Sequence, residues 1–206
     1  MREMIGACLH NALKFHFLLM DSWFSAQENF EYITDKGKHF IAALKGNRLV
    51  AVSEDDRRGK RFVAVEELEF PEHGVLQGWL KGYAKETRLV RQVFTNKDGS
   101  TGILHLVCSD ITRNYDATTM SYKKRWQVGV FHKNLKSNAA LAKSPTQTQR
   151  TQSSHIFMAI CAAFKRECLS LKTKLNLMAL RAKLLTNATR SAFEKLRQQQ
   201  TQPAVA

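Results

Sequence analysis

The chain has 206 residues and a net charge of +14, and its composition, with 44% apolar and 24% charged residues, is globular. The four cysteines have no CxxC spacing and no histidine pair at ligand spacing, which argues against a zinc site and a disulfide framework. The longest purely apolar run, 156–164, has nine residues. A membrane-spanning helix needs about 18 or more. We therefore expect a soluble, cytoplasmic protein with no membrane partner.

Positive charge is concentrated in the second half of the chain. Residues 1–100 carry 15 basic and 14 acidic side chains, whereas residues 101–206 carry 17 basic and 4 acidic ones. The default partner of such a positive field is a polyanion, above all nucleic acid. A basic surface that serves solubility, or that pairs with an acidic protein, explains the composition equally well.

The first 46 residues show two helical and two strand-like segments in alternation: 4–13, 15–20, 25–36 and 39–44. Ser25 and Glu28 have the spacing of a capping box, which predicts the start of the second helix. Gly37 is the expected stop of that helix.

The remaining elements are predicted to be strands and then helices. The strand-like runs are 62–65, 88–94 and 102–108. Asp98-Gly99, within the turn 95–100, predicts a hairpin between the last two runs. From about Asp116 the pattern is helical, with one break at 144–146 and a polar end at 198–202 that should fray.

This order of elements predicts an α/β fold with a β-rich insertion and a helical C-terminal part. The predicted parts are a core segment with Asp21, the insertion, a basic helical part and a frayed tail, over residues 1–46, 47–112, 113–197 and 198–206.

Asp21 is the most informative single residue. It directly follows the strand predicted over 15–20, and α/β folds place functional groups at the carboxyl ends of buried strands. An isolated aspartate in this place is more often a turn residue, so the pattern alone favours the turn.

A second set of candidates lies in the basic part, at positions 0, 3, 7 and 14 counted from the first of them. These residues are Tyr122, Arg125, Gly129 and Lys136. A continuous helix would place them on one face, where Tyr, Arg and Lys can hold a phosphate backbone. The alternative is a solvated basic face with Trp126 and Phe131 in the core.

Four other polar residues have simpler explanations. We expect His105 to pack in a strand, His155 to lie near the start of a helix, and Asp110 to serve a turn or cap. His132 is equally suited to meeting phosphate and to facing solvent.

The segments DSWFS at 21–25 and YKKRWQVGVFHKNLKSNAALAKSPT at 122–146 resemble the transposases of bacterial insertion sequences with a DDE active site. The similarity covers nearly the whole chain. It implies a ribonuclease-H-like catalytic domain interrupted by a β insertion, of which this chain would hold a part. It also implies DNA, in the form of transposon ends, as a partner, and it is compatible with a homo-oligomer or with co-assembly with an active transposase.

The resemblance also implies a metal-dependent active site. Such enzymes hold two divalent ions, for which Mg²⁺ is well suited, with two aspartates and a glutamate. Asp21 matches the second aspartate, a catalytic and metal-binding residue. Tyr122, Arg125 and Lys136 match the residues that are thought to grip transposon-end DNA.

Two departures from the family pattern favour a truncated, catalytically decayed copy. Gly129 occupies the position of the glutamate, and only Glu3 is acidic among the 20 residues before Asp21. The competing hypotheses are therefore a transposase that performs metal-dependent DNA cleavage and strand transfer, a non-catalytic remnant that occupies transposon ends or inhibits active transposase, and an unselected product without a settled role.

Overall fold

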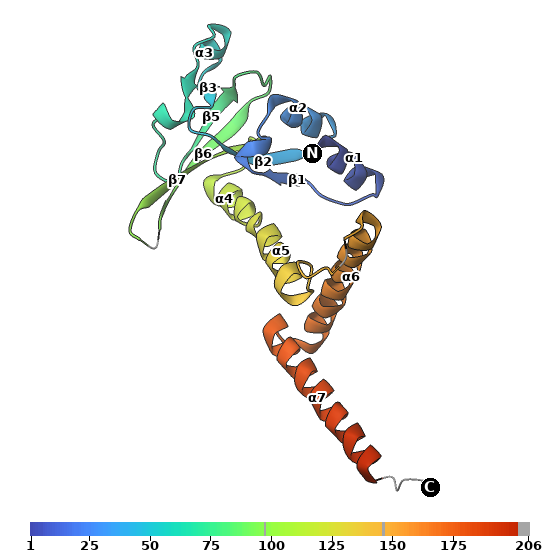
Figure 1. Ribbon diagram of the computed structural model, residues 1–206. Coiled ribbons are helices and arrows are strands. Elements are labelled where there is room, and N and C mark those ends of the chain that lie inside the picture. The colour runs from blue at the N-terminus through green and yellow to red at the C-terminus, as the bar shows by residue number, and fades with distance from the viewer. Residues whose placement is uncertain (97, 146, 202–206) are drawn as a thin grey trace. The chain divides into compact units, whose positions relative to one another are not determined.

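The computed structural model describes residues 1–96, 98–145 and 147–201, and the chain divides into two units. Unit 1 comprises residues 1–127 and is built on a β-sheet, whereas unit 2 begins at Val128 and is helical where it is described. Figure 1 shows the elements in chain order.

Unit 1 contains one seven-stranded sheet. Its strands are β1 (Phe17–Met20), β2 (His39–Leu44), β3 (Leu49–Ala51), β4 (Val63–Ala64), β5 (Val75–Leu80), β6 (Thr87–Thr95) and β7 (Thr101–Cys108). They lie in the order β1-β2-β7-β6-β5-β3-β4, in which β1 and β2 are parallel and every other pair is antiparallel. Because helices pack on this sheet, the α/β prediction is confirmed.

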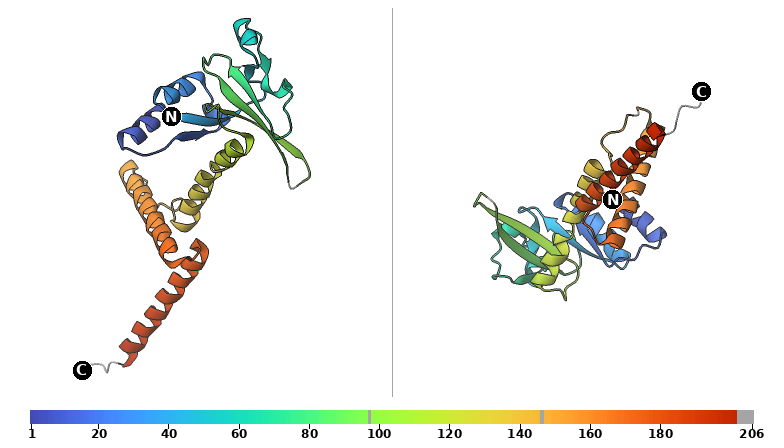
Figure 2. Two further views of the ribbon diagram at one scale, coloured as in Figure 1. Left: turned by 180° about the vertical axis from the view of Figure 1, so that it is seen from behind. Right: turned by 90° about the horizontal axis from the view of Figure 1, so that it is seen from below.

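Helices cover both faces of the sheet. The helical elements of unit 1 are α1 (Arg2–His10), η1 (Ser22–Phe24), α2 (Gln27–Asp35), α3 (Glu54–Arg58), η2 (Val65–Glu67) and α4 (Tyr115–Lys123). On one face, Phe40 of β2 packs in a cluster with Ile5 of α1 and Phe30 of α2. On the other face, Ile41 of β2 packs in a cluster with Tyr122 of α4. Alternating residues of β2 are thus buried on opposite sides. Figures 1 and 2 show the helices α2 and α4 on opposite sides of this strand.

Helix α2 forms where it is predicted, but the expected capping box does not. Its N-cap is Ala26, which makes no side-chain cap hydrogen bond. The Ser25 hydroxyl instead donates to the Ala43 carbonyl, 2.6 Å away, so it ties η1 to β2. The stop at Gly37 is confirmed: this residue has φ +67°, and the Lys38 N–H donates to the Ile33 carbonyl, which closes a Schellman motif.

The predicted hairpin is the β6–β7 pair, whose register aligns Thr95 with Thr101. Gly99 has φ +82°, a conformation that glycine adopts readily, and Lys97 of the expected turn lies outside the described residues. Near the tip, the Phe94 ring fills the space that a side chain on its cross-strand partner Gly102 would occupy. The tip is therefore held by an aromatic–glycine pair as well as by the turn.

Residues 47–112 contain the strands β3 to β7, of which β3 and β5 are strands that the sequence pattern did not reveal. β3 has three residues, and β5 is interrupted by the polar Gln77 and by Gly78. Short or mixed runs such as these give a weak strand signal, and they become strands by pairing with neighbours in the sheet.

The chain from Trp126 onward forms α5 (Trp126–Asn138), α6 (Gln149–Thr173) and α7 (Leu177–Thr201). In the described part of unit 2, the buried apolar side chains are Leu135, Ala159 and Leu180. The predicted break at 144–146 falls between α5 and α6, with Thr146 outside the described residues. None of the described helices is both long and apolar enough to cross a membrane.

The end of the helical part differs from the expectation. Helix α7 continues through the glutamines at 198–200 to Thr201, where fraying was predicted from residue 198. Glutamine has a favourable intrinsic helix propensity, which accounts for the continuation. Residues 202–206 of the expected tail lie outside the described part of the chain.

Candidate functional site at the end of strand β1

Asp21 lies directly after β1, as predicted, and it shapes the turn that follows. It is the N-cap of η1, where its Oδ1 accepts a hydrogen bond of 2.7 Å from the Ser22 N–H. Its own carbonyl accepts from the Phe24 N–H at 3.0 Å. The turn role that the sequence pattern favoured is therefore present.

The second carboxylate oxygen of Asp21 faces a basic residue that lies near the C-terminal end of unit 1 in the sequence. Arg125 Nη1 lies 3.3 Å from Asp21 Oδ2, so the two form an ion pair. The Arg125 guanidinium also lies 5.2 Å from the ring centroid of Tyr122 and 5.4 Å from that of Trp126. Cation–π contacts of this kind hold a guanidinium in place, so the structure brings together candidates from both sequence motifs.

Tyr122 belongs to the core, since its side chain is 3% exposed and packs in the cluster with Ile41 and Leu106. Burial raises the pKa of its hydroxyl above the ordinary value of a tyrosine. A ring buried in this way does not face solvent, and its contact with Arg125 makes it a support for that guanidinium.

The single helix expected to carry all four basic-part candidates is interrupted. Helix α4 ends at Lys123 and α5 begins at Trp126, with Lys124 and Arg125 in the turn between them. The Arg125 N–H donates to the Tyr122 carbonyl, a three-residue spacing that tightens the chain at this point. Gly129 and Lys136 lie on α5 in unit 2, and both are exposed.

The other four candidates behave largely as expected. His105 is 8% exposed in β7, and its ring centroid lies 5.9 Å from that of Phe70. The Asp110 carboxylate accepts from the Thr112 N–H, so it serves a turn. His132 is exposed on α5, and a ring nitrogen of His155 lies 3.0 Å from the Ala140 carbonyl.

The residues at Asp21 do not fit the two-ion site that the family resemblance implies. One oxygen of Asp21 accepts a backbone N–H and the other faces a guanidinium, so both already have donors. Position 129 carries no side-chain ligand. Across the part of the chain that the structure describes, no three His, Cys, Asp or Glu side chains come together as a metal site. The described residues around Asp21 therefore do not form a ligand set for two Mg²⁺ ions.

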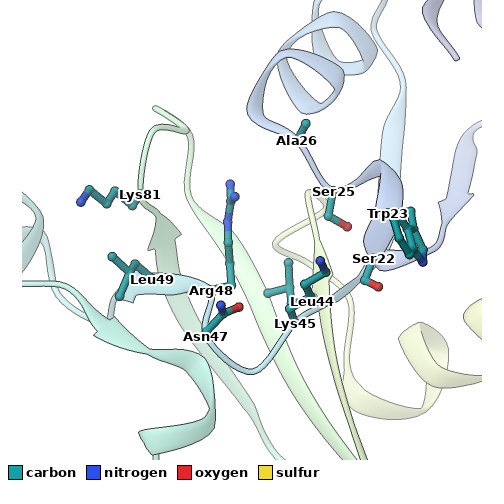
Figure 3. Close-up of a pocket in the computed structure, with 10 residues that line it drawn as sticks. All are labelled: Ser22, Trp23, Ser25, Ala26, Leu44, Lys45, Asn47, Arg48, Leu49 and Lys81. Carbon is teal, nitrogen blue, oxygen red and sulfur yellow. The ribbon is translucent and has the colours of Figure 1, made fainter.

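A basic pocket opens beside Asp21, and sequence patterns did not predict it. It has a volume of about 440 Å³ and is lined by Ser22, Trp23, Ser25, Ala26, Leu44, Lys45, Asn47, Arg48, Leu49 and Lys81. Figure 3 shows Arg48 standing between the segment after β1, on one side, and Leu49 and Lys81 on the other. The three basic residues come from two separate turns and form no sequence motif, so only the fold assembles them.

One protein-family model matches most of the chain. The family model described as a transposase DDE domain matches residues 1–165, which include both Asp21 and Arg125. The chain therefore belongs to the transposases with a DDE domain, as its resemblance to insertion-sequence transposases predicted. No curated protein matched the chain.

Proposed function

We propose that this chain is a transposase-family protein that binds DNA and does not cleave it. The observation that carries the proposal is the Asp21–Arg125 ion pair, in which the candidate catalytic carboxylate is held by the candidate DNA-binding arginine. A carboxylate engaged in this way, with glycine at position 129, lacks the ligands for the two-metal chemistry of the family.

Charge supports DNA as the partner. Residues 128–206 carry 13 basic and 2 acidic side chains, and Lys133 and Lys136 on α5 are exposed. Exposed lysines neutralise phosphates without reading base sequence. We therefore assign DNA contacts to Arg125 and Lys136 and a supporting role under Arg125 to Tyr122, and we expect little sequence preference.

A ribonuclease-H-like core is part of the same proposal. It is supported by the parallel pair β1–β2, the helix α2 between these strands, and the carboxylate placed directly after β1. In such a core the β-rich segment is the insertion. The biological role that fits these features is the occupation of transposon ends in competition with active transposase.

The test is a binding titration with fluorescent duplex DNA at increasing salt. The logarithm of the association constant should fall linearly with the logarithm of the salt concentration, by a slope of about 0.9 for each neutralised phosphate. Arg125→Met and Lys136→Met should each weaken binding and lower that slope. Lys36→Met removes an equal charge at the end of α2 and should change neither quantity. Binding that does not depend on salt would contradict the proposal.

A further inference from the structure

Arg48 is the residue around which the basic pocket beside Asp21 is organised. Its side chain is partly buried, and burial lowers its pKa below the ordinary value. Its Nε atom is fully buried, and within the described part of the chain it has no hydrogen-bond partner. A buried N–H without an acceptor is energetically unfavourable. Arg48 also lines the pocket, so a bound anion there could accept hydrogen bonds from its guanidinium.

Lys45 supplies a second positive charge, and Trp23 holds it in place. The Lys45 ammonium lies over the Trp23 ring, 5.3 Å from the ring centroid. Trp23 is 83% exposed, so the contact is made at the surface and not in the core. A cation–π contact restrains a lysine that is otherwise mobile. This gives a structural reason for a large aromatic side chain at so exposed a position.

The lining of the pocket favours an anion. It contains Lys45, Arg48 and Lys81 and, among the described residues, no acidic side chain. Glu66 packs against Gly46 of the same turn, but no ion pair with Arg48 is found in the described part of the chain. The net charge of the residues that line the pocket is therefore positive.

We propose that this pocket binds a phosphodiester of DNA, with Arg48 and Lys45 as its ligands and Trp23 as the residue that positions Lys45. A guanidinium presents several N–H donors in one plane, which suits the paired oxygens of a phosphate. The pocket shares Ser22 with the turn that Asp21 caps, so it adjoins the Asp21–Arg125 pair. The inference rests on the proposed DNA binding and adds a second contact point to it.

The experiment measures the affinity of the full chain for duplex DNA as a function of salt. Arg48→Met keeps the aliphatic stem and Lys45→Met keeps most of the side-chain volume, so both remove mainly charge. Each should weaken binding and lower the salt slope by up to about 0.9. The matched control is Lys36→Met, because the Lys36 ammonium also lies over an aromatic ring, that of Tyr32, but outside the pocket. Equal unfolding midpoints establish that all three variants fold.

A double-mutant cycle tests the role of Trp23. Trp23→Leu should weaken binding in the unchanged chain and have no further effect in the Lys45→Met background, because Trp23 acts through Lys45. Trp23→Phe keeps a ring for the ammonium and should restore most of the affinity. An equal loss from Trp23→Leu in both backgrounds would overturn the positioning role.

Three outcomes separate the possible failures. If the unchanged chain shows no salt-dependent binding, the proposed function itself fails. If it binds DNA and both pocket variants match Lys36→Met, only the pocket assignment fails. The pocket could instead bind free phosphate, and inorganic phosphate is the probe for that alternative. If Arg48→Met removes the binding of inorganic phosphate to the chain but leaves the affinity for duplex DNA equal to that of Lys36→Met, the pocket is a site for the free ion and the proposal is overturned.

Discussion

Asp21 and Arg125 are separated by 104 residues in the chain, and the Asp21 Oδ2 atom lies 3.3 Å from Arg125 Nη1. About half of the Asp21 side chain and a quarter of the Arg125 side chain are exposed. Because the pair is partly solvated, it contributes only about 0–1 kcal/mol to folding. In the DNA-binding role proposed for Arg125, its larger effect would be on binding, because the carboxylate would compete with DNA phosphates for the same guanidinium.

The change Asp21→Asn should therefore strengthen DNA binding. It releases the Arg125 guanidinium and removes a negative charge beside the basic pocket, and it should lower the free energy of unfolding by less than about 1 kcal/mol. Affinity for duplex DNA and urea unfolding are the two measurements. Asp35→Asn, at the end of α2, is the control for charge alone. Weaker binding by Asp21→Asn than by Asp35→Asn would contradict the competition.

Gly129→Ala and Gly129→Glu should both stabilise α5. Gly129 lies in the helix interior, and a Cβ added there meets nothing within 4 Å. Replacing an exposed helical glycine stabilises a helix by up to about 1 kcal/mol. Thermal unfolding followed by circular dichroism measures the effect, and a lower midpoint in Gly129→Ala would contradict it.

The same Gly129→Glu variant should not restore DNA cleavage. It adds one carboxylate, whereas the family chemistry needs a set of ligands around two ions, and Asp21 remains paired with Arg125. A supercoiled-plasmid nicking assay in Mg²⁺ or Mn²⁺ should show no activity for the unchanged chain or for Gly129→Glu. Metal-dependent nicking by the unchanged chain that Asp21→Ala abolishes would refute the proposal of a non-cleaving protein.

Protonation of His105 should destabilise the fold. Burial lowers the pKa of His105 below the ordinary value of 6.5, and nearby Arg91 lowers it further. The unfolded chain therefore binds the proton first, so the stability that neutral His105 contributes is present above pH 6.5 and is lost as the pH falls. Urea unfolding at several pH values should show a smaller loss on acidification for His105→Gln than for the unchanged chain. His132→Gln, at an exposed position, should behave like the unchanged chain.

Cys108 should be unreactive while the chain is folded. It is 0% exposed, and burial raises the pKa of its thiol to about 11, so the nucleophilic thiolate is scarce at neutral pH. Cys8, Cys161 and Cys168 are partly exposed. A thiol-reactive chromophore should label three cysteines quickly and the fourth only after denaturant is added. Rapid labelling of Cys108 in the folded chain would show that β7 is more open than the structure indicates.

Sequence patterns predicted the elements whose local signals are strong. The run 39–44 is almost entirely apolar, and it became β2 with the predicted bounds. Ser25 shows the limit of such patterns, because its hydroxyl is bound by the Ala43 carbonyl and so does not cap α2. A local motif cannot reveal that a partner 18 residues away competes for the same group.

In the candidate site, too, the sequence identified individual residues but not the contacts that the fold creates between them. Asp21 and Arg125 were both identified from their motifs, yet their pairing depends on the packing of α4 against the sheet. Tyr122 was expected on an exposed face, and its burial also depends on that packing. Arg48 lies in a short polar turn with no periodicity, so no sequence signal marks it.

The contact between Phe94 and Gly102 has a consequence for how the β6–β7 hairpin keeps its alignment. The Phe94 ring occupies the space that any side chain at position 102 would need, so a shift of one residue would bring the ring against a bulky neighbour such as Ile103. The pairing of the Phe94 ring with the glycine at position 102 thus favours a single register of β6 against β7. Because this contact lies outside the turn, we expect a peptide tag inserted at Gly99 to leave the register of the two strands unchanged.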